Sequence, residues 1–318
     1  MPAIGTLLER FQIGIYCVAI LFGLLGADLL VPQSMLPKLI TPALALMLFA
    51  TFLQVPVLQL GLIFRQLRFL YTLGVVNFIL VPLLVFALQP LLSPDPIIRL
   101  AVLLVLLTPC IDYVITFAYV GRADASLLLA ATPLLLLLQV LLLPIYLRVF
   151  LGETAVELLH IRPFIEAFIA LILIPLLLAA SFQYISRYFV RIRQVVSVLD
   201  VLPVPATAAV LFVVVGAVAP QLEYALSDAL RVAPVYVLFA VLAPIIGWWG
   251  ARWARLSSTA ARAVAFSAGT RNSLVILPLA LAIPTAQPLL PVLIITQTLI
   301  ELLASLVYMQ VMPRLRIN

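Results

Sequence analysis

The chain has 318 residues, of which 66% are hydrophobic and only 9% are charged, and its formal net charge is +6. Soluble domains carry about 25% charged residues, so this composition excludes a soluble protein and indicates a polytopic membrane protein. The basic residues lie in short segments between apolar runs, where they act as topology determinants. They do not indicate a nucleic-acid interface.

Ten apolar runs are candidates for membrane-spanning helices, because about 20 apolar residues suffice to cross a bilayer. The first run follows Arg10. It is longer than the apolar region of a signal peptide, which has about 7 to 15 residues, so we expect it to be retained as a helix. The loops between the runs are too short for a soluble domain. The expected spans are residues 11–31, 39–61, 69–92, 97–120, 126–148, 163–183, 195–219, 232–251, 262–284 and 288–312.

The distribution of arginines predicts the orientation of the chain. With the N-terminus inside, most arginines lie in cytoplasmic segments, as the positive-inside rule requires. We therefore expect both termini to be cytoplasmic. We also expect a multi-pass protein of the plasma membrane, which would be the inner membrane of a bacterium or archaeon.

Two halves of five spans each are expected, over residues 1–150 and 151–318. Because five is an odd number, a duplicated second half must insert upside down relative to the first. Weak internal similarity supports a duplication, since Gln139 and Tyr146 are seven residues apart in the fifth span, as Glu301 and Tyr308 are in the tenth. The sequence thus predicts an all-α fold with an inverted five-plus-five repeat.

The fourth and ninth spans each carry a polar interruption at mid-depth. In the fourth span, Pro109 removes a backbone donor and opens the hydrogen-bond ladder, and Cys110 and Asp112 stand beside it. In the ninth span, residues 269–273 read Gly-Thr-Arg-Asn-Ser. Broken helices with polar residues near the midplane form the binding sites of many secondary transporters, so we expect the site at these two breaks.

Cys110 is the candidate substrate ligand. Both cysteines, Cys17 and Cys110, lie in apolar spans, which makes a disulfide framework unexpected. A buried free cysteine is commonly an inert apolar side chain, and this interpretation fits Cys17. Cys110 differs because the break admits water and helix ends, which favour the thiolate. Thiolates bind soft ions such as trivalent arsenic and antimony, cuprous copper or zinc.

Arg271 is the residue whose placement within a membrane span costs the most free energy, because a charge there needs a partner or water. Three interpretations stay open. Arg271 can form an ion pair with Asp112 that holds the two breaks together, it can be a tethered cation in the place where another carrier binds sodium, or it can receive an anionic substrate. The first two are compatible, and Asn272 beside it is a supporting polar group.

Glu301 lies in the last span, where Gln297, Glu301 and Ser305 share one helix face at a spacing of four. Desolvation disfavours the charged form of a buried carboxylate, so we expect Glu301 to take and release protons. The alternative is a neutral, hydrogen-bonded packing residue. Further polar side chains that can support the broken helices are Asn77, Gln139 and Thr132.

Several runs of the chain resemble the arsenical-resistance branch of the bile acid:sodium symporter superfamily. They are Pro109-Cys110-Ile111-Asp112-Tyr113, Gly121-Arg122-Ala123-Asp124, Ala131-Thr132-Pro133-Leu134, Arg271-Asn272-Ser273, Leu277-Pro278-Leu279-Ala280 and Ile300-Glu301-Leu302. The resemblance implies a panel domain from spans one, two, six and seven. It also implies a core domain from the other six spans, in which the fourth and ninth break and cross.

The resemblance also implies an activity, namely arsenite export against proton entry, with Cys110 and Glu301 as the functional cysteine and glutamate. The better-known arsenite permeases have Pro-Cys followed by Thr-Ala-Met, and paired asparagines in the ninth span. This chain has Pro109-Cys110-Ile111-Asp112 and Arg271-Asn272 instead, which indicates a divergent subgroup. An arginine at the crossing also disfavours sodium at that place.

We therefore expect a proton-coupled exporter of As(III), and in some cases Sb(III), with As(III) bound at Cys110. The alternative is a sodium- or proton-coupled symporter of an organic anion, either bile-acid-like or a small carboxylate. The expected partners are the small-molecule substrate, protons and the lipid bilayer. The single His160 excludes a histidine-rich metal site, and the only lysine, Lys38, follows no glycine-rich loop, so the sequence has no Walker phosphate-binding motif. We expect no cofactor, and no enzymatic activity because the sequence shows no nucleophile–base pair or metal cluster.

Overall fold

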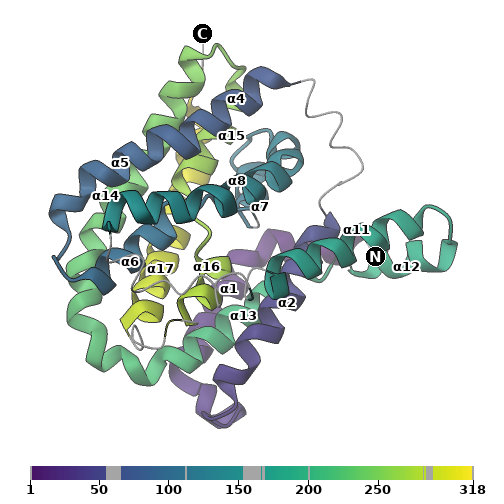
Figure 1. The fold of residues 1–318 in the computed structure, drawn as a ribbon. Helices are drawn as coiled ribbons and strands as arrows, with labels where there is room; N and C mark the ends of the chain where they lie inside the picture. The colour runs from purple at the N-terminus through teal and green to yellow at the C-terminus, as the bar shows by residue number, and fades with distance from the viewer. Residues whose placement is uncertain are drawn as a thin grey trace. The chain divides into compact units, whose positions relative to one another are not determined.

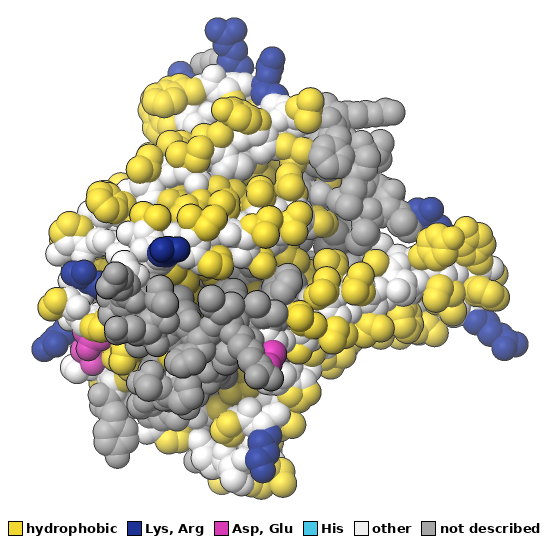
Figure 2. Space-filling model, in the orientation of Figure 1, with side chains coloured by type: hydrophobic (Ala, Val, Ile, Leu, Met, Phe, Trp, Pro, Cys, Tyr) yellow, Lys and Arg dark blue, Asp and Glu magenta, His cyan; other side chains and the backbone are white. Residues whose placement is uncertain are grey.

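A computed structural model describes residues 2–54, 66–111, 113–152, 166, 169–199, 201–281, 283 and 289–316, and most of them are helical (Figure 1). Hydrophobic side chains cover much of the described surface in view (Figure 2). Five described helices are apolar and long enough to cross a membrane, and shorter apolar helices accompany them. The all-helical, multi-pass architecture agrees with the sequence, while the number of ten spans stays a prediction. The five helices are Leu36–Gln54, Leu67–Leu91, Ala125–Leu151, Ala225–Trp253 and Leu289–Arg314.

The chain forms two compact units, and each unit draws on both halves of the sequence. Unit 1 consists of Met1–Val55 and His160–Tyr224, and unit 2 consists of Pro56–Leu159 and Ala225–Asn318. The predicted spans one, six and seven and most of span two fall in unit 1, and the other six fall in unit 2. This is the grouping that the resemblance implies for panel and core. The boundary at residue 150 concerns repeats, not compact units, and stays a prediction.

Unit 1 is a helical layer in which α13 packs against both α1 and α2, and α11 packs against α2. Two glycines let α1 and α13 approach closely. A Cβ atom on Gly23 would lie 2.9 Å from the carbonyl oxygen of Phe212, and one on Gly216 would lie 2.6 Å from the Cβ of Ala27. The described elements are α1 (Pro2–Leu30), α2 (Leu36–Gln54), η4 (Ile169–Leu173), α11 (Ile174–Ser186), α12 (Val190–Leu199), α13 (Pro203–Val218) and η5 (Ala219–Gln221).

Unit 2 is built around α17, which packs against α6 and α16, and around α8, which packs against α6, α7 and α15. Both predicted broken spans are broken: the fourth forms α6 and α7, and the ninth forms α15 and α16. The described elements are α4 (Leu67–Val75), η2 (Val76–Leu80), α5 (Val81–Leu88), η3 (Gln89–Leu91), α6 (Pro96–Leu106), α7 (Val114–Val120), α8 (Ala125–Leu151), α14 (Leu222–Trp253), α15 (Ser258–Gly269), α16 (Ser273–Leu281), α17 (Leu289–Val311) and η7 (Met312–Arg314).

Two prolines within helices of unit 2 have no N–H to donate to the carbonyl four residues earlier. In each case, the hydroxyl of a tyrosine from another helix donates to that carbonyl. Pro82 cannot donate to Phe78, and the Tyr146 hydroxyl of α8 donates to the Phe78 oxygen at 2.5 Å. The helix adopts a π-turn there, over Val76–Leu80. Likewise, the Tyr308 hydroxyl of α17 donates to the carbonyl oxygen of Ala240, one turn before Pro244. Each tyrosine therefore joins its own helix to the proline-containing turn of another helix.

Replacing Tyr146 with phenylalanine should lower the free energy of unfolding by about 1 kcal/mol, because it leaves a buried carbonyl without a donor. Thermal unfolding of the purified protein in detergent measures the effect. The matched control is Tyr71→Phe, because Tyr71 is 76% exposed on α4 and should lose almost nothing. Equal midpoints for both variants would contradict the assigned role of Tyr146.

Candidate functional site

The two broken spans of unit 2 meet through their unwound segments. The Cys110 N–H donates to the Thr270 carbonyl at 3.1 Å, and the Asn272 N–H donates to the Thr108 carbonyl at 2.9 Å. These bonds make an isolated antiparallel bridge between Pro109 and Arg271. We call residues Thr108–Ile111 and Thr270–Asn272 the crossing. In the crossing, each unwound segment provides hydrogen-bond partners for the main chain of the other, where neither has partners within its own helix.

The two half-helices that lead into the crossing, α6 and α15, have side-chain hydrogen bonds at both of their ends. Asp95 caps the start of α6, where its carboxylate accepts from the Ile97 N–H at 2.7 Å, and Ser257 caps the start of α15. At the other ends, the hydroxyls of Thr108 and Thr270 bond back to the carbonyls of Leu104 and Phe266, at 3.0 and 2.8 Å. Such bonds satisfy groups that a helix end leaves without partners.

Glu301 connects α17 to the crossing and is 2% exposed. Its carboxylate accepts hydrogen bonds from the Tyr113 hydroxyl at 2.8 Å, from the Arg271 N–H at 2.7 Å and from the Gln297 amide at 2.5 Å. Burial favours the neutral carboxyl, whereas three donors favour the carboxylate. Two large and opposite effects on the charge of the carboxyl group therefore act on this one side chain.

Arg271 is fully buried, and its guanidinium lies where α6 and α15 end. Nη2 donates to the carbonyls of Ser267 and Ala268, both at 2.6 Å, and Nη1 donates to the Leu106 carbonyl at 3.4 Å. Carbonyls at helix C-termini carry partial negative charge, so the two half-helices together hold the cation. The guanidinium also stacks over the Phe239 ring at 5.4 Å.

Asn77 is the third contributor to this arginine site. Its side-chain oxygen accepts from Arg271 Nη2 at 2.9 Å, and its amide donates to the Ser267 hydroxyl at 3.0 Å. Asn77 lies in the π-turn of the helix that precedes α5, which links this bend to the crossing. Asp112, the partner predicted for Arg271, lies outside the described residues.

Several buried polar atoms around the crossing have no hydrogen-bond partner among the described residues. Both polar atoms of the Asn272 side chain are in this state, and Asn272 is 1% exposed. Native proteins rarely leave such atoms unsatisfied, so these atoms are the hydrogen-bonding groups near the crossing that a small polar molecule or water could use. The other atoms are Nε of Arg271, Oε1 of Gln297 and Oγ of Ser305.

The structure brings together most of the residues singled out from the sequence. Cys110 is 1% exposed in the crossing, directly beside the bridge to Arg271. Gln297, Glu301 and Ser305 all lie on the buried face of α17, as their spacing predicts. The supporting residues on α8 are different: Thr132 bonds back to Leu128 within its own helix, and no described hydrogen bond joins Gln139 to Glu301 or Arg271.

Sequence reasoning missed two polar contributors. In the sequence, Tyr113 stands out only as part of the run that begins at Pro109, yet its hydroxyl donates to the Glu301 carboxylate. Ser267 bonds Asn77 through its hydroxyl and Arg271 through its carbonyl. A signal existed for Ser267, which lies one helical turn before Arg271. None existed for Tyr113 beyond its position next to the break.

Four features of unit 2 recur after the same shift of 162 residues, for example from Phe78 to Ala240 and from Tyr146 to Tyr308. The same shift takes Cys110 to Asn272 and Thr108 to Thr270, so the two main-chain bonds of the crossing exchange places. The recurring features are the caps Asp95 and Ser257, the threonines Thr108 and Thr270, the bonds of Cys110 and Asn272, and the tyrosines Tyr146 and Tyr308.

Comparison with known proteins identifies the family. The family described as Sodium Bile acid symporter family matches residues 41–226, which is more than half of the chain. The matched residues include Asn77 and the first segment of the crossing, whereas Arg271 and Glu301 lie beyond them. A search among curated proteins gave no match. The chain belongs to the sodium/bile acid symporter family, whose members are transporters and not enzymes.

Proposed function

We propose that this protein is a proton-coupled secondary transporter that exports arsenite, and antimonite by the same chemistry. The observation that carries the proposal is the Glu301 carboxylate, which is buried and bonded to the main chain of the crossing through the Arg271 N–H. Protonation of Glu301 would remove the charge to which this N–H donates. Coupling would then act directly on the segment beside Cys110.

The surroundings of Arg271 support protons over sodium as the coupling ion. In carriers with broken helices, helix C-terminal carbonyls coordinate the sodium ion. Here the carbonyls of Leu106, Ser267 and Ala268 accept from a guanidinium instead. A second cation in the same place would meet the charge of Arg271 at short range. The tethered-cation interpretation is therefore the one that these contacts favour.

The unsatisfied polar atoms favour a small neutral solute with several hydroxyls, and Cys110 favours a soft one. Arsenous acid is a neutral trihydroxide at pH 7. The Cys110 thiol can form one As–S bond while one As–O bond breaks, and the thiol proton leaves with the hydroxyl as water. The two remaining hydroxyls can then bond groups such as the Asn272 amide. One thiol gives a reversible adduct, which suits a carrier.

The recurring contacts support alternating access between two related halves. We propose that unit 2 contains two inverted copies of one helical motif, because its caps, threonines, main-chain bonds and tyrosines recur after one constant shift. The crossing lies on the pseudo-twofold axis of such a repeat. A site on this axis can open to either side of the membrane by equivalent movements.

The second candidate is a symporter of an organic anion, and the family match favours it. Arg271 would be the natural receptor for a carboxylate, but its Nη1 and Nη2 atoms already bond four oxygen atoms. Thermal-shift measurements separate the two candidates. Stabilisation by bile acids or small carboxylates, without stabilisation by arsenite, would favour the symporter.

Replacing Cys110 with serine should abolish arsenite resistance in an efflux-deficient host, because serine cannot form the As–S bond. Growth in arsenite and arsenite accumulation in everted vesicles measure the effect. The matched control is Cys17→Ser, since Cys17 is the other cysteine and is exposed on α1. That variant should retain resistance. Arsenite export by folded Cys110→Ser protein would rule out the proposed role of the thiol.

A further inference from the structure

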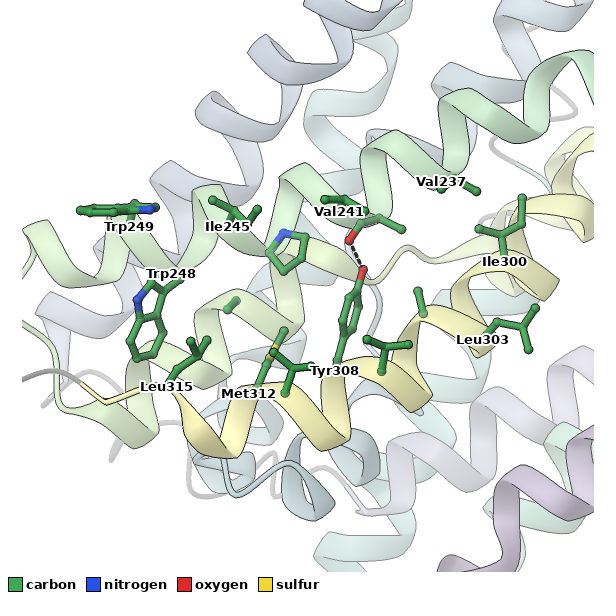
Figure 3. Close-up of a pocket in the computed structure, with 16 residues that line it drawn as sticks. Val237, Val241, Ile245, Trp248, Trp249, Ile300, Leu303, Tyr308, Met312 and Leu315 are labelled. Carbon is green, nitrogen blue, oxygen red and sulfur yellow. Dashed lines mark hydrogen bonds between the residues drawn. The ribbon is translucent and has the colours of Figure 1, made fainter.

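A groove of about 740 Å³ lies between α14 and α17 within unit 2, and no residue of the crossing lines it (Figure 3). None of the sixteen described residues that line it is charged. Val237 and Ile300 lie at one end, and Trp248 and Met312 lie at the other. The two helices therefore run in the same direction along the groove, and both end at its tryptophan end.

Apolar side chains at helical spacing form both walls of this groove. Val237, Val241, Ile245 and Trp249 follow one another every four residues on α14, and each is about half exposed. Leu303, Val307 and Val311 do the same on α17, with exposures between 46% and 63%. A long apolar channel of this kind fits a hydrocarbon chain that lies parallel to both helices.

The tryptophan end of the groove carries positive charge. Arg252 is exposed one turn after Trp248 and stacks over the Trp249 ring at 5.3 Å. Arg314 is exposed in η7, between Met312 and Leu315, which both line the groove. Aromatic residues next to basic residues mark the interfacial zone of a membrane protein. This end belongs to the side predicted to face the cytoplasm, where anionic lipids attract arginines.

Unit 2 contains a natural comparison for this surface. Under the shift of 162 residues the groove corresponds to the surface between α5 and α8, which also exposes apolar residues such as Leu83 and Ile145. There, Phe86 and Phe150 pack edge to face at 5.9 Å, in place of Trp248 and Met312. Pro90 and Gly152 stand in place of Arg252 and Arg314. At these two positions, only the surface between α14 and α17 carries arginines.

We infer that the groove between α14 and α17 binds one anionic phospholipid. Its acyl chain would lie along Val241, Ile245 and Val307, and its phosphate would lie between Arg252 and Arg314. The charge of these two arginines selects the anionic headgroup, because the walls of the groove are apolar and cannot distinguish headgroups. The inference uses no residue of the crossing, so it stands whatever solute the crossing carries.

Tryptophan fluorescence tests the inference directly. The chain has three tryptophans, and all of them, Trp248, Trp249 and Trp253, lie at this end of α14. The full-length protein in detergent is titrated with phosphatidylglycerol or phosphatidylcholine that carries bromine on its acyl chains, and bromine quenches nearby tryptophans. Phosphatidylglycerol should reach half-maximal quenching at a lower mole fraction, by about fivefold for each arginine that contacts the headgroup.

Two pairs of variants decide the outcome. Arg252→Gln with Arg314→Gln should reduce the preference for phosphatidylglycerol to within about twofold. The control Arg148→Gln with Arg231→Gln, which neutralises two other exposed arginines of unit 2, should keep it. Ala304→Phe, which fills the groove, should weaken quenching by both lipids, whereas Ala130→Phe on α8 should not.

Three results would overturn the inference. Equal quenching by both lipids in the unaltered protein would show an ordinary lipid-facing surface. A preference that survives the loss of Arg252 and Arg314 would place the headgroup elsewhere. Tryptophans that neither lipid reaches would indicate a protein partner, such as a second copy of the chain, on this face.

Discussion

A variant without the Glu301 charge should no longer accumulate arsenite against the arsenite concentration gradient. For each exchanged proton, a pH difference of one unit can hold about a tenfold solute gradient, because it corresponds to about 1.4 kcal/mol. Glu301→Gln removes the titrating group but keeps a side chain of the same size among Tyr113, Gln297 and the Arg271 N–H. Everted vesicles with an imposed pH gradient should therefore reach the same arsenite concentration inside and outside.

The same variant should still exchange labelled for unlabelled arsenite, because exchange at equilibrium needs the Cys110 site and no proton. This result separates a coupling residue from a residue that only supports the fold. The matched control is Asp228→Asn, since Asp228 is a surface carboxylate of unit 2 that pairs with Arg231 at 3.7 Å. It should concentrate arsenite normally. Proton-driven accumulation in Glu301→Gln vesicles would refute the coupling role.

Removal of the Arg271 charge should destabilise unit 2 by about 3 to 5 kcal/mol, because it leaves buried oxygen atoms without their cation. In Arg271→Gln, the carbonyls of Ser267 and Ala268 and the Asn77 side chain lose their shared donor. Thermal unfolding in detergent should show a large drop in midpoint. Arg271→Lys keeps the charge but has a compact ammonium group, so this variant should lose less stability than Arg271→Gln.

If the guanidinium stands in for an ion, sodium should partly rescue the variant that lacks it. Midpoints for Arg271→Gln should rise in sodium chloride relative to choline chloride at equal ionic strength, since the vacated carbonyls can coordinate sodium. The unaltered protein and Arg231→Gln, which changes an exposed arginine, should not distinguish the salts. A variant that folds but responds equally to both salts would contradict the tethered-cation interpretation.

Much of the site follows from local features of the sequence. Pro109 must break a helix because it has no N–H, and a charge such as Arg271 or Glu301 within an apolar span must face protein. The spacing of Gln297, Glu301 and Ser305 places them on one face of α17, which is buried in the structure. These inferences need no knowledge of how the helices pack.

Other parts of the site depend on packing and could not be derived in this way. A search for a partner to Arg271 looks for acidic side chains, but its described partners are mostly backbone carbonyls of α6 and α15. Any residue type can supply a carbonyl, so the sequence does not mark it. The contact between Tyr113 and Glu301 joins residues 188 positions apart and exists only because the crossing brings α7 next to α17.

The constant spacing of 162 residues within unit 2 shows which residues stand at equivalent positions, and the reactive side chains of the site are not duplicated. At equivalent positions, Glu301 corresponds to Gln139, Arg271 to Pro109, and Cys110 to Asn272. In the proposed repeat, the thiol, the carboxylate and the guanidinium are each present in one copy, and a side chain without that chemistry stands at the equivalent position of the other. An assembly of two N-terminal copies would have two equivalents of Cys110 and no Glu301. An assembly of two C-terminal copies would have two equivalents of Glu301 and no Cys110. In the proposed repeat the two copies are therefore complementary, and neither could perform the proposed exchange by pairing with itself.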